Sequence, residues 1–131
     1  MEFLELLNLF EYKQRVDNYY TKVYNGCYIN ISRHRKFFDL HINVTNYHLT
    51  SGNINIYENI VLYNTIVEKL KISQYTKMTR SMPSGGGPYV SNNVCTFSIT
   101  CDDLNIFYNF LMLFDIECSR NIKIGDILDE S

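Results

Sequence analysis

Apolar and polar residues alternate along residues 19–44, and this alternation predicts three antiparallel strands joined by two tight turns. Asn25-Gly26 is expected to form the first turn, because asparagine tolerates and glycine freely adopts the positive φ that a type I′ turn requires. The second turn is the four-residue loop Arg33–Lys36. The expected inward face comprises Tyr20, Tyr24, Cys27, Ile29, Ile31, Phe38, Leu40 and Ile42.

The loop at residues 33–36 sets a register in which Ser32 pairs with Phe37. The resulting pairs are Ile31 with Phe38, Ile29 with Leu40 and Cys27 with Ile42 on the inward face, and Asn30 with Asp39 and Tyr28 with His41 on the outward face. The two faces are therefore an apolar one for the core and a polar, aromatic one for solvent or a partner.

The first hairpin places Tyr24 opposite Cys27, Tyr20 opposite Ile31 and Lys22 opposite Ile29 on the inward face. Lys22 is the one misfit in this apolar pattern. An edge strand would tolerate a lysine there, and the charge would discourage edge-to-edge association. We therefore expect the strand that contains Lys22 to lie at an edge of the sheet.

Helical spacing of apolar residues predicts helices over residues 2–16, 56–72 and from about 100 to 117. In the first, Leu4 and Leu9 widen the apolar surface beyond a simple stripe, so the helix is either buried on two sides or meets a partner. Strands are expected at residues 75–80 and 94–101, joined by the glycine-rich segment 82–93 as a hairpin loop.

These elements predict an α+β fold, with an antiparallel sheet of about five strands and helices on one face, in the order α-β-β-β-α-β-β-α. The 131 residues suit a single domain that spans the whole chain. Residues 118–131 form an acidic C-terminal tail, whose four apolar residues suggest a short strand or a segment docked in a groove.

Composition is that of a folded protein, with 46% hydrophobic and 20% charged residues. No apolar run reaches the roughly 18 residues of a membrane span, so we expect no membrane association. Glu2 and Glu5 stand where a signal peptide would have a basic start, and we expect an intracellular protein. The abundance of asparagine, isoleucine and tyrosine, all encoded by AT-rich codons, hints at a virus or mobile element, and thus at the host cytoplasm or nucleus.

Charge is unevenly distributed along the chain. Residues 1–80 carry ten Lys/Arg and seven Asp/Glu, whereas residues 81–131 carry two and seven. The balances of +3 and −5 give the overall charge of −2. This asymmetry indicates one cationic and one acidic end, without the basic excess typical of nucleic-acid-binding domains.

Complete catalytic or metal-binding patterns are missing from the sequence. The four cysteines form no C-x-x-C pair, so we expect neither a metal nor a cofactor, and Cys27 and Cys95 are interpreted as small buried residues. His41 lies two residues from Asp39, and His48 begins an H-x-T pattern of the kind found twice in two-histidine phosphoesterases. A small hydrolase or phosphoesterase that uses His41 or His48 is therefore an alternative, although more than one such motif is required.

The expected partner-binding surface combines the basic turn with aromatic residues. Cationic and aromatic side chains are frequent at binding hot spots, and a basic hairpin tip can also bind phosphates. The candidate residues are Tyr28, Arg33, Arg35, Lys36, Phe37, His41 and, in the glycine-rich segment, Tyr89.

We therefore expect a non-enzymatic protein-interaction module that acts as a homodimer and binds a host protein as a small viral or mobile-element accessory protein. The alternative, which the charge balance does not favour, is a nucleic-acid or nucleotide-binding protein that uses the basic turn at residues 33–36.

Overall fold

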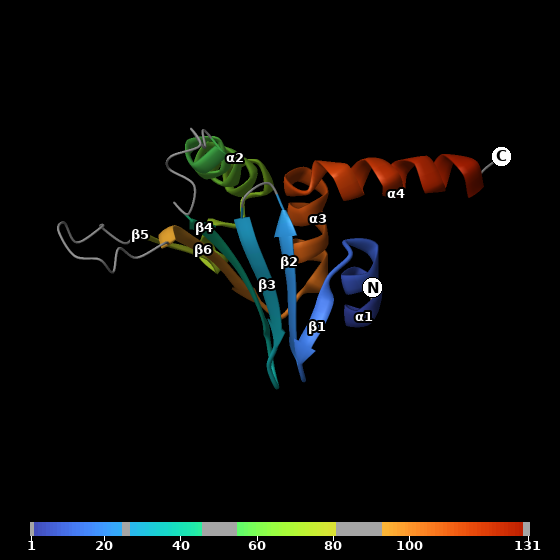
Figure 1. Ribbon diagram of the computed structural model, residues 1–131, viewed down its shortest axis with the longest axis horizontal. Helices are drawn as coiled ribbons and strands as arrows, with labels where there is room; N and C mark the ends of the chain where they lie inside the picture. The colour runs from blue at the N-terminus through green and yellow to red at the C-terminus, as the bar shows by residue number, and fades with distance from the viewer. Residues whose placement is uncertain (1, 25–26, 46–54, 81–92, 130–131) are drawn as a thin grey trace.

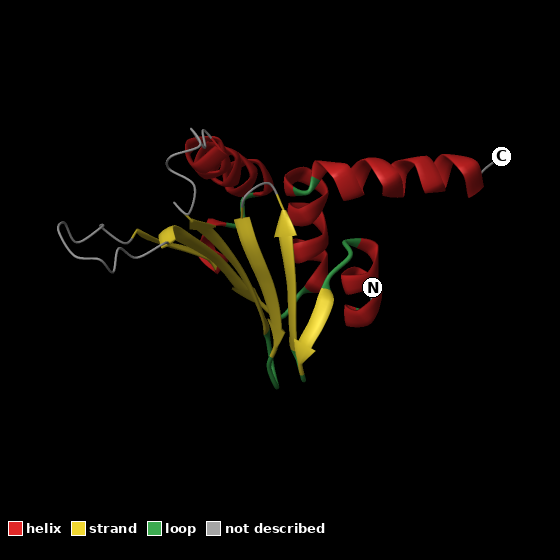
Figure 2. Cartoon of the chain, in the orientation of Figure 1, coloured by secondary structure: helices red, strands yellow, loops and turns green. Residues whose placement is uncertain are grey.

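A computed structural model describes residues 2–24, 27–45, 55–80 and 93–129, in which six strands form one antiparallel sheet and four α-helices lie beside it (Figures 1 and 2). The strands are β1 (Lys13–Val16), β2 (Tyr19–Tyr24), β3 (Cys27–Arg33), β4 (Phe38–Thr45), β5 (Thr76–Arg80) and β6 (Asn93–Cys101). The helices are α1 (Phe3–Leu9), α2 (Asn55–Leu70), α3 (Leu104–Phe114) and α4 (Ile116–Asp129), with a short 3₁₀-helix, η2, at Ser73–Tyr75.

The sheet has the strand order β1-β2-β3-β4-β6-β5, and every neighbouring pair is antiparallel. The predicted α+β class with an antiparallel sheet is confirmed, with six strands in place of about five. The hairpin of β5 and β6 is also confirmed, and the glycine-rich segment between them lies outside the described residues.

Aromatic contacts hold three helices on the apolar face of the sheet. The ring of Phe3 in α1 stacks on Phe38 at 5.0 Å between centroids, and Phe107 of α3 meets Phe38 edge-on at 6.3 Å. Tyr63 of α2 stacks on Phe97 of β6 at 4.1 Å. Such ring pairs add to the free energy gained by burying the rings, so they fix the helices over this face.

The expected inward face is confirmed as part of the hydrophobic core. Its aliphatic members are almost wholly buried, and its aromatic members are partly buried against them. Among the described side chains of β3, β4 and β6, the fully buried ones are Cys27, Ile29, Ile31, Leu40, Ile42, Phe97 and Ile99. Thr96, Ser98 and Thr100 alternate with the inward residues of β6 and lie on the other face, as predicted.

The register of the first hairpin is confirmed, with Tyr24 paired with Cys27 and Lys22 with Ile29. The strand that contains Lys22 is not the outermost one, because β1 pairs with residues 19–21 of β2. Lys22 itself lies beyond this pairing and is bonded to β3 alone among the described strands. The Asn25-Gly26 turn itself lies outside the described residues.

The predicted register of the second hairpin is wrong by two residues. Arg33 pairs with Phe38, and the four-residue loop runs from His34 to Phe37. An offset of two preserves the faces, because side chains alternate with a period of two. Contacts within the turn favour this register: the His34 amide donates to the Phe37 carbonyl at 2.8 Å, and the two rings stack at 4.5 Å.

The predicted N-terminal helix over residues 2–16 is too long, because α1 ends at Leu9 and residues 13–16 form β1. Glu11 adopts a positive φ of 63°, its amide donates to the Asn8 carbonyl at 3.3 Å, and the Tyr12 amide donates to the Leu7 carbonyl at 2.9 Å. These two bonds are the Schellman motif, which satisfies the last carbonyls of a helix and turns the chain.

The predicted extension of the third helix to residue 117 is wrong, and so is the short strand suggested for the tail, because residues 116–129 form a further helix. Asp103 caps α3, accepting a hydrogen bond from the Asn105 amide at 3.0 Å, and the helix stops at Phe114. A second helix, α4, then runs through most of the expected tail and extends away from the sheet (Figure 1). Asp115 separates the two helices, because its Oδ1 accepts a hydrogen bond from the Cys118 amide at 3.2 Å and so caps α4.

A cationic recess at the edge of the sheet

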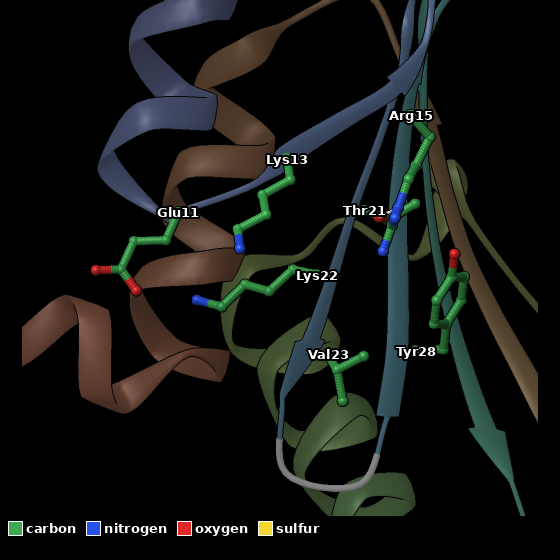
Figure 3. Close-up of a pocket in the computed structure, with 7 residues that line it drawn as sticks. All are labelled: Glu11, Lys13, Arg15, Thr21, Lys22, Val23 and Tyr28. Carbon is green, nitrogen blue, oxygen red and sulfur yellow. Dashed lines mark hydrogen bonds between the residues drawn. The ribbon is translucent and has the colours of Figure 1, made fainter.

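A recess of about 470 Å³ lies where β1 separates from β2. Pairing of β1 with β2 ends at Lys13 and Thr21, so residues 22–24 of β2 pair only with β3 among the described strands. The lining residues are Glu11, Lys13, Arg15, Thr21, Lys22, Val23 and Tyr28 (Figure 3). The volume is within the range of small-ligand sites, and the recess adjoins an unpaired strand edge.

The path of β1 brings Lys13 and Arg15 to the recess. Asn18, with a φ of 63°, turns the chain from β1 into β2, and the pairing shifts between Gln14 and Val16. A bulge of this kind redirects a side chain at a sheet edge. The Arg15 Nε donates to Thr21 Oγ1 at 2.9 Å, which directs the guanidinium along the recess (Figure 3).

Lys22 links the recess to the helices behind it. Its Nζ donates to the Phe10 carbonyl at 2.7 Å, forms an ion pair with the Asp115 carboxylate and approaches Cys118 Sγ at 3.1 Å. Burial alone would lower the pKa of Lys22, but its hydrogen bonds to Asp115 and Cys118 outweigh that effect and raise it. The lysine therefore remains charged, and Asp115, whose side chain is 1% exposed, is its counter-ion.

Two groups near Lys22, the Cys118 thiol and the Tyr12 hydroxyl, have raised pKa values. Burial raises the pKa of the Cys118 thiol, and the hydrogen bond from Lys22 only partly offsets it. Burial, with a contribution from the Asp115 charge, raises the pKa of Tyr12 well above its ordinary value. The Tyr12 hydroxyl has no hydrogen-bond partner among the described residues. A protonated thiol is a weaker nucleophile than a thiolate, so burial reduces the reactivity of Cys118.

Lys13 and Arg15 form no ion pair with any carboxylate of the described residues. Lys22 is neutralised by Asp115, and Glu11 is the single acidic group in the lining. The recess thus presents two cations without an ion-pair partner among the described residues, beside the exposed ring of Tyr28 and the side chain of Val23, which is 71% exposed. This arrangement can bind carboxylates or phosphates and an adjoining apolar group.

The predicted partner-binding residues do not form one surface. Tyr28 lines the recess, whereas Arg33 is five residues away along β3, about 17 Å at the usual rise of a strand. Arg35, Lys36 and Phe37 are exposed at the far turn. Tyr89 lies outside the described residues.

Internal contacts reduce the charge that the basic turn offers to a ligand. The Arg33 guanidinium lies over the Phe3 ring at 5.8 Å, on the helix side of the sheet. His34 Nε2 contacts Asp39 Oδ2 at 2.8 Å. Arg35 and Lys36 remain as cations without an ion-pair partner among the described residues.

His41, one of the two histidines of the hydrolase alternative, lies within the sheet. His41 is half-buried between Asn30 and Ser98 on the neighbouring strands, not beside Tyr28. Asp39 instead contacts His34 Nε2 and accepts a hydrogen bond from the Thr100 hydroxyl at 2.5 Å. His48 lies outside the described residues.

Within the described ranges, no three His, Cys, Asp or Glu side chains are grouped as metal ligands would be. Nor does any helix there have the length and apolar character needed to cross a bilayer.

Sequence reasoning missed Lys13, Arg15 and Asp115. The first two were assigned to a helix, although the Asp17-Asn18 pair before the alternating residues 19–24 is a turn signal that would have favoured a hairpin. Lys22 in an apolar strand face was itself a signal, because a buried lysine requires a counter-ion.

Searches against protein-family models, curated proteins and solved structures find no match to this chain.

Proposed function

We propose that the protein is a non-enzymatic protein-interaction module that binds an acidic, extended segment of a partner protein in the recess. The observation that carries the proposal is the pair of cations, Lys13 and Arg15, that form no ion pair among the described residues and lie beside residues 22–24 of β2, which pair only with β3. Its cellular setting, in this proposal, is that of a small intracellular accessory protein of a virus or mobile element, supported by the AT-rich composition.

Residues 22–24 of β2 pair with β3 on one side only, and their other edge suits a partner in extended conformation. A peptide that adds to a sheet edge gains main-chain hydrogen bonds, and its alternate side chains point to opposite sides. The cations and the exposed apolar side chains share the outward face of the sheet, because Lys13 pairs with Thr21, Arg15 donates to Thr21, and Val23 pairs with Tyr28. On this face, acidic residues of the segment reach Lys13 and Arg15, and apolar residues cover Val23 and Tyr28, which are exposed large side chains.

The two cations explain why the partner segment should be acidic. Charge-assisted hydrogen bonds to carboxylates are stronger than neutral ones, and an arginine binds a carboxylate with two parallel bonds. The Nε of Arg15 is occupied by Thr21, so the terminal nitrogens are the donors that face a ligand. A neutral segment would leave the desolvation of both cations uncompensated.

Selection from a random library of 12-residue peptides displayed on phage tests this function. We expect the selected peptides to be rich in Asp and Glu, with apolar residues an even number of positions away, because the cations and the apolar side chains share one face of the sheet. Synthetic copies should bind at least tenfold more weakly to Lys13→Glu/Arg15→Glu, a loss of about 1.4 kcal/mol or more, by fluorescence anisotropy. Affinity should also fall as salt concentration rises.

The matched control is Arg35→Glu/Lys36→Glu, which makes the same charge change at the distant turn and should leave peptide affinity unchanged. Circular dichroism establishes that both double variants fold. The proposal is wrong if the selected peptides are not acidic, or if the recess variant binds them as well as the wild type does. Salt-dependent binding of a 12-nucleotide DNA or RNA that only the turn variant loses would favour the nucleic-acid alternative.

A further inference from the structure

The outward face of α2 carries an apolar patch formed by Val61, which is exposed, and by Leu62, which is partly buried against the core. Val61 is 64% exposed, and with Glu58, Leu62 and Thr65 it lines a shallow recess of about 430 Å³. The Thr65 hydroxyl donates to the Val61 carbonyl at 2.8 Å, so its hydrogen is used within the helix. The centre of this face is therefore almost entirely apolar.

Opposite charges flank the apolar centre. Glu58 stands one turn before it, and Lys69 stands one turn after it. Lys69 follows Glu58 by eleven positions, which is about three helical turns. The two side chains differ in direction by only about 20° around the helix axis, so both lie on the same face of α2. Neither side chain forms an ion pair within the described part of the chain.

We propose that this face binds a second copy of the chain, with two α2 helices packed antiparallel across a two-fold axis. An axis near residues 63–64 places Glu58 of each copy against Lys69 of the other, while Val61, Leu62 and Thr65 meet at the centre. A two-fold interface requires such self-complementarity, because the same patch is used on both subunits. A parallel pairing would set like charges against each other.

The size of this face sets the strength of the association. A 16-residue helix is about 24 Å long, and one face of it buries less than the roughly 800 Å² per partner of a standard stable interface. We therefore expect a reversible dimer that forms at micromolar to submillimolar concentrations. The interaction is independent of the recess at β1 and β2 and does not rest on the function proposed above.

Sedimentation equilibrium from about 5 to 500 µM tests the proposal. The weight-average mass of the wild type should rise from 15.5 kDa towards twice that value. Val61→Lys should remain monomeric throughout, because it places two lysines at the centre of the interface. Its fold is checked by circular dichroism, and its peptide binding at the recess should be unchanged, which separates this proposal from the proposed function.

A charge-swap series tests the antiparallel geometry. Glu58→Lys and Lys69→Glu should each weaken the dimer about tenfold, and Glu58→Lys/Lys69→Glu should restore it, because the two ion pairs re-form with exchanged signs. Lys77→Glu on β5 is the matched control and should not alter the mass. A monomer at 500 µM overturns the proposal. So does a dimer that survives Val61→Lys, or a double variant without restored association.

Discussion

At the scale of single residues, the most consequential contact is the ion pair between Lys22 and Asp115. It joins residues 93 positions apart, with side chains that are 11% and 1% exposed. A buried pair contributes little net free energy when intact, but removal of one partner leaves an uncompensated charge. Asp115 also caps α4, so its position determines both the charge balance and the start of the helix.

Lys22→Met should lower the free energy of unfolding by about 3–5 kcal/mol, because the buried Asp115 carboxylate loses its counter-ion. Adding Asp115→Asn should recover at least half of this loss, since the amide oxygen can still cap α4 but carries no charge. Urea unfolding of the two single variants and the double variant measures the coupling.

Lys13→Met is the matched control for that series, because Lys13 is exposed and unpaired among the described residues. It should change stability by no more than about 0.5 kcal/mol. A Lys22→Met variant as stable as Lys13→Met would show that the Asp115 charge is compensated by other groups.

At the scale of elements, two helices end without the usual glycine. In α1 the left-handed position is occupied by Glu11, and in α2 by Lys71, with φ angles of 63° and 55°. Behind Lys71, the Ile72 amide donates to the Val67 carbonyl at 3.2 Å, as in the motif at Glu11. Residues other than glycine pay about 1 kcal/mol for this conformation, so tertiary packing must hold it.

Lys71→Gly should therefore raise the free energy of unfolding by roughly 0.5–1 kcal/mol, because glycine adopts positive φ without a steric cost. Thermal and urea unfolding provide the measurement. Lys71→Ala removes the same charge but retains the Cβ, and it should give no stabilisation. Equal stabilisation by both variants would trace the effect to charge, not to backbone conformation.

The strand faces were predictable from sequence, but these helix ends were not. Alternation in β2, β3, β4 and β6 reports directly on which side chains face the core, and the structure confirms those faces. The helix over residues 2–16 was extended too far because glutamate at the end of α1 gives no stop signal. The role of Asp115 could not be predicted for a related reason. An aspartate within an apolar helical run gives no sequence signal that one helix ends there and that it caps a second one.

At the scale of the whole molecule, several buried groups have pKa values above their ordinary ones. Burial raises the pKa of Cys27 from 9.0 to about 12 and raises those of Cys101, Cys118 and Tyr12. In each case the folded protein retains a proton at a pH where the unfolded chain releases it. Unfolding then releases protons, and a rise in pH favours the unfolded state.

The free energy of unfolding should consequently fall as pH rises above about 9, where thiols of the unfolded chain ionise. Lys22 acts in the same direction, since its raised pKa gives stabilisation that is lost only as pH rises past its ordinary value of 10.5. Urea unfolding between pH 7.5 and 10.5, with a reducing agent present, measures the slope.

Cys27→Ala should remove up to one proton from this dependence, about 1.4 kcal/mol per pH unit above pH 9. Ile29→Val, a substitution at a neighbouring buried site, should lower stability equally at every pH and leave the slope unchanged. A wild-type stability that is constant or rising up to pH 10.5 would contradict the assignment of these buried protons.

The recess is a property of the whole molecule, and for that reason the sequence did not reveal it. Its lining comes from the chain after α1 and from β1, β2 and β3, and it exists only because β1 separates from β2 after a bulge. Tyr28 was identified because it is an exposed aromatic residue on a predicted strand. Lys13 and Arg15 required knowledge of where β1 runs, which depends on the end of α1.

Lys22 belongs both to the lining of the recess and to the anchor of α4, and this makes the two sites thermodynamically linked. An anion that drew the Lys22 ammonium towards itself would weaken its ion pair with Asp115, and a loosening of α4 would free the ammonium for the anion. By reciprocity, the coupling free energy is the same in both directions. In the proposed complex, a ligand bound in the recess would thus also be an effector of α4.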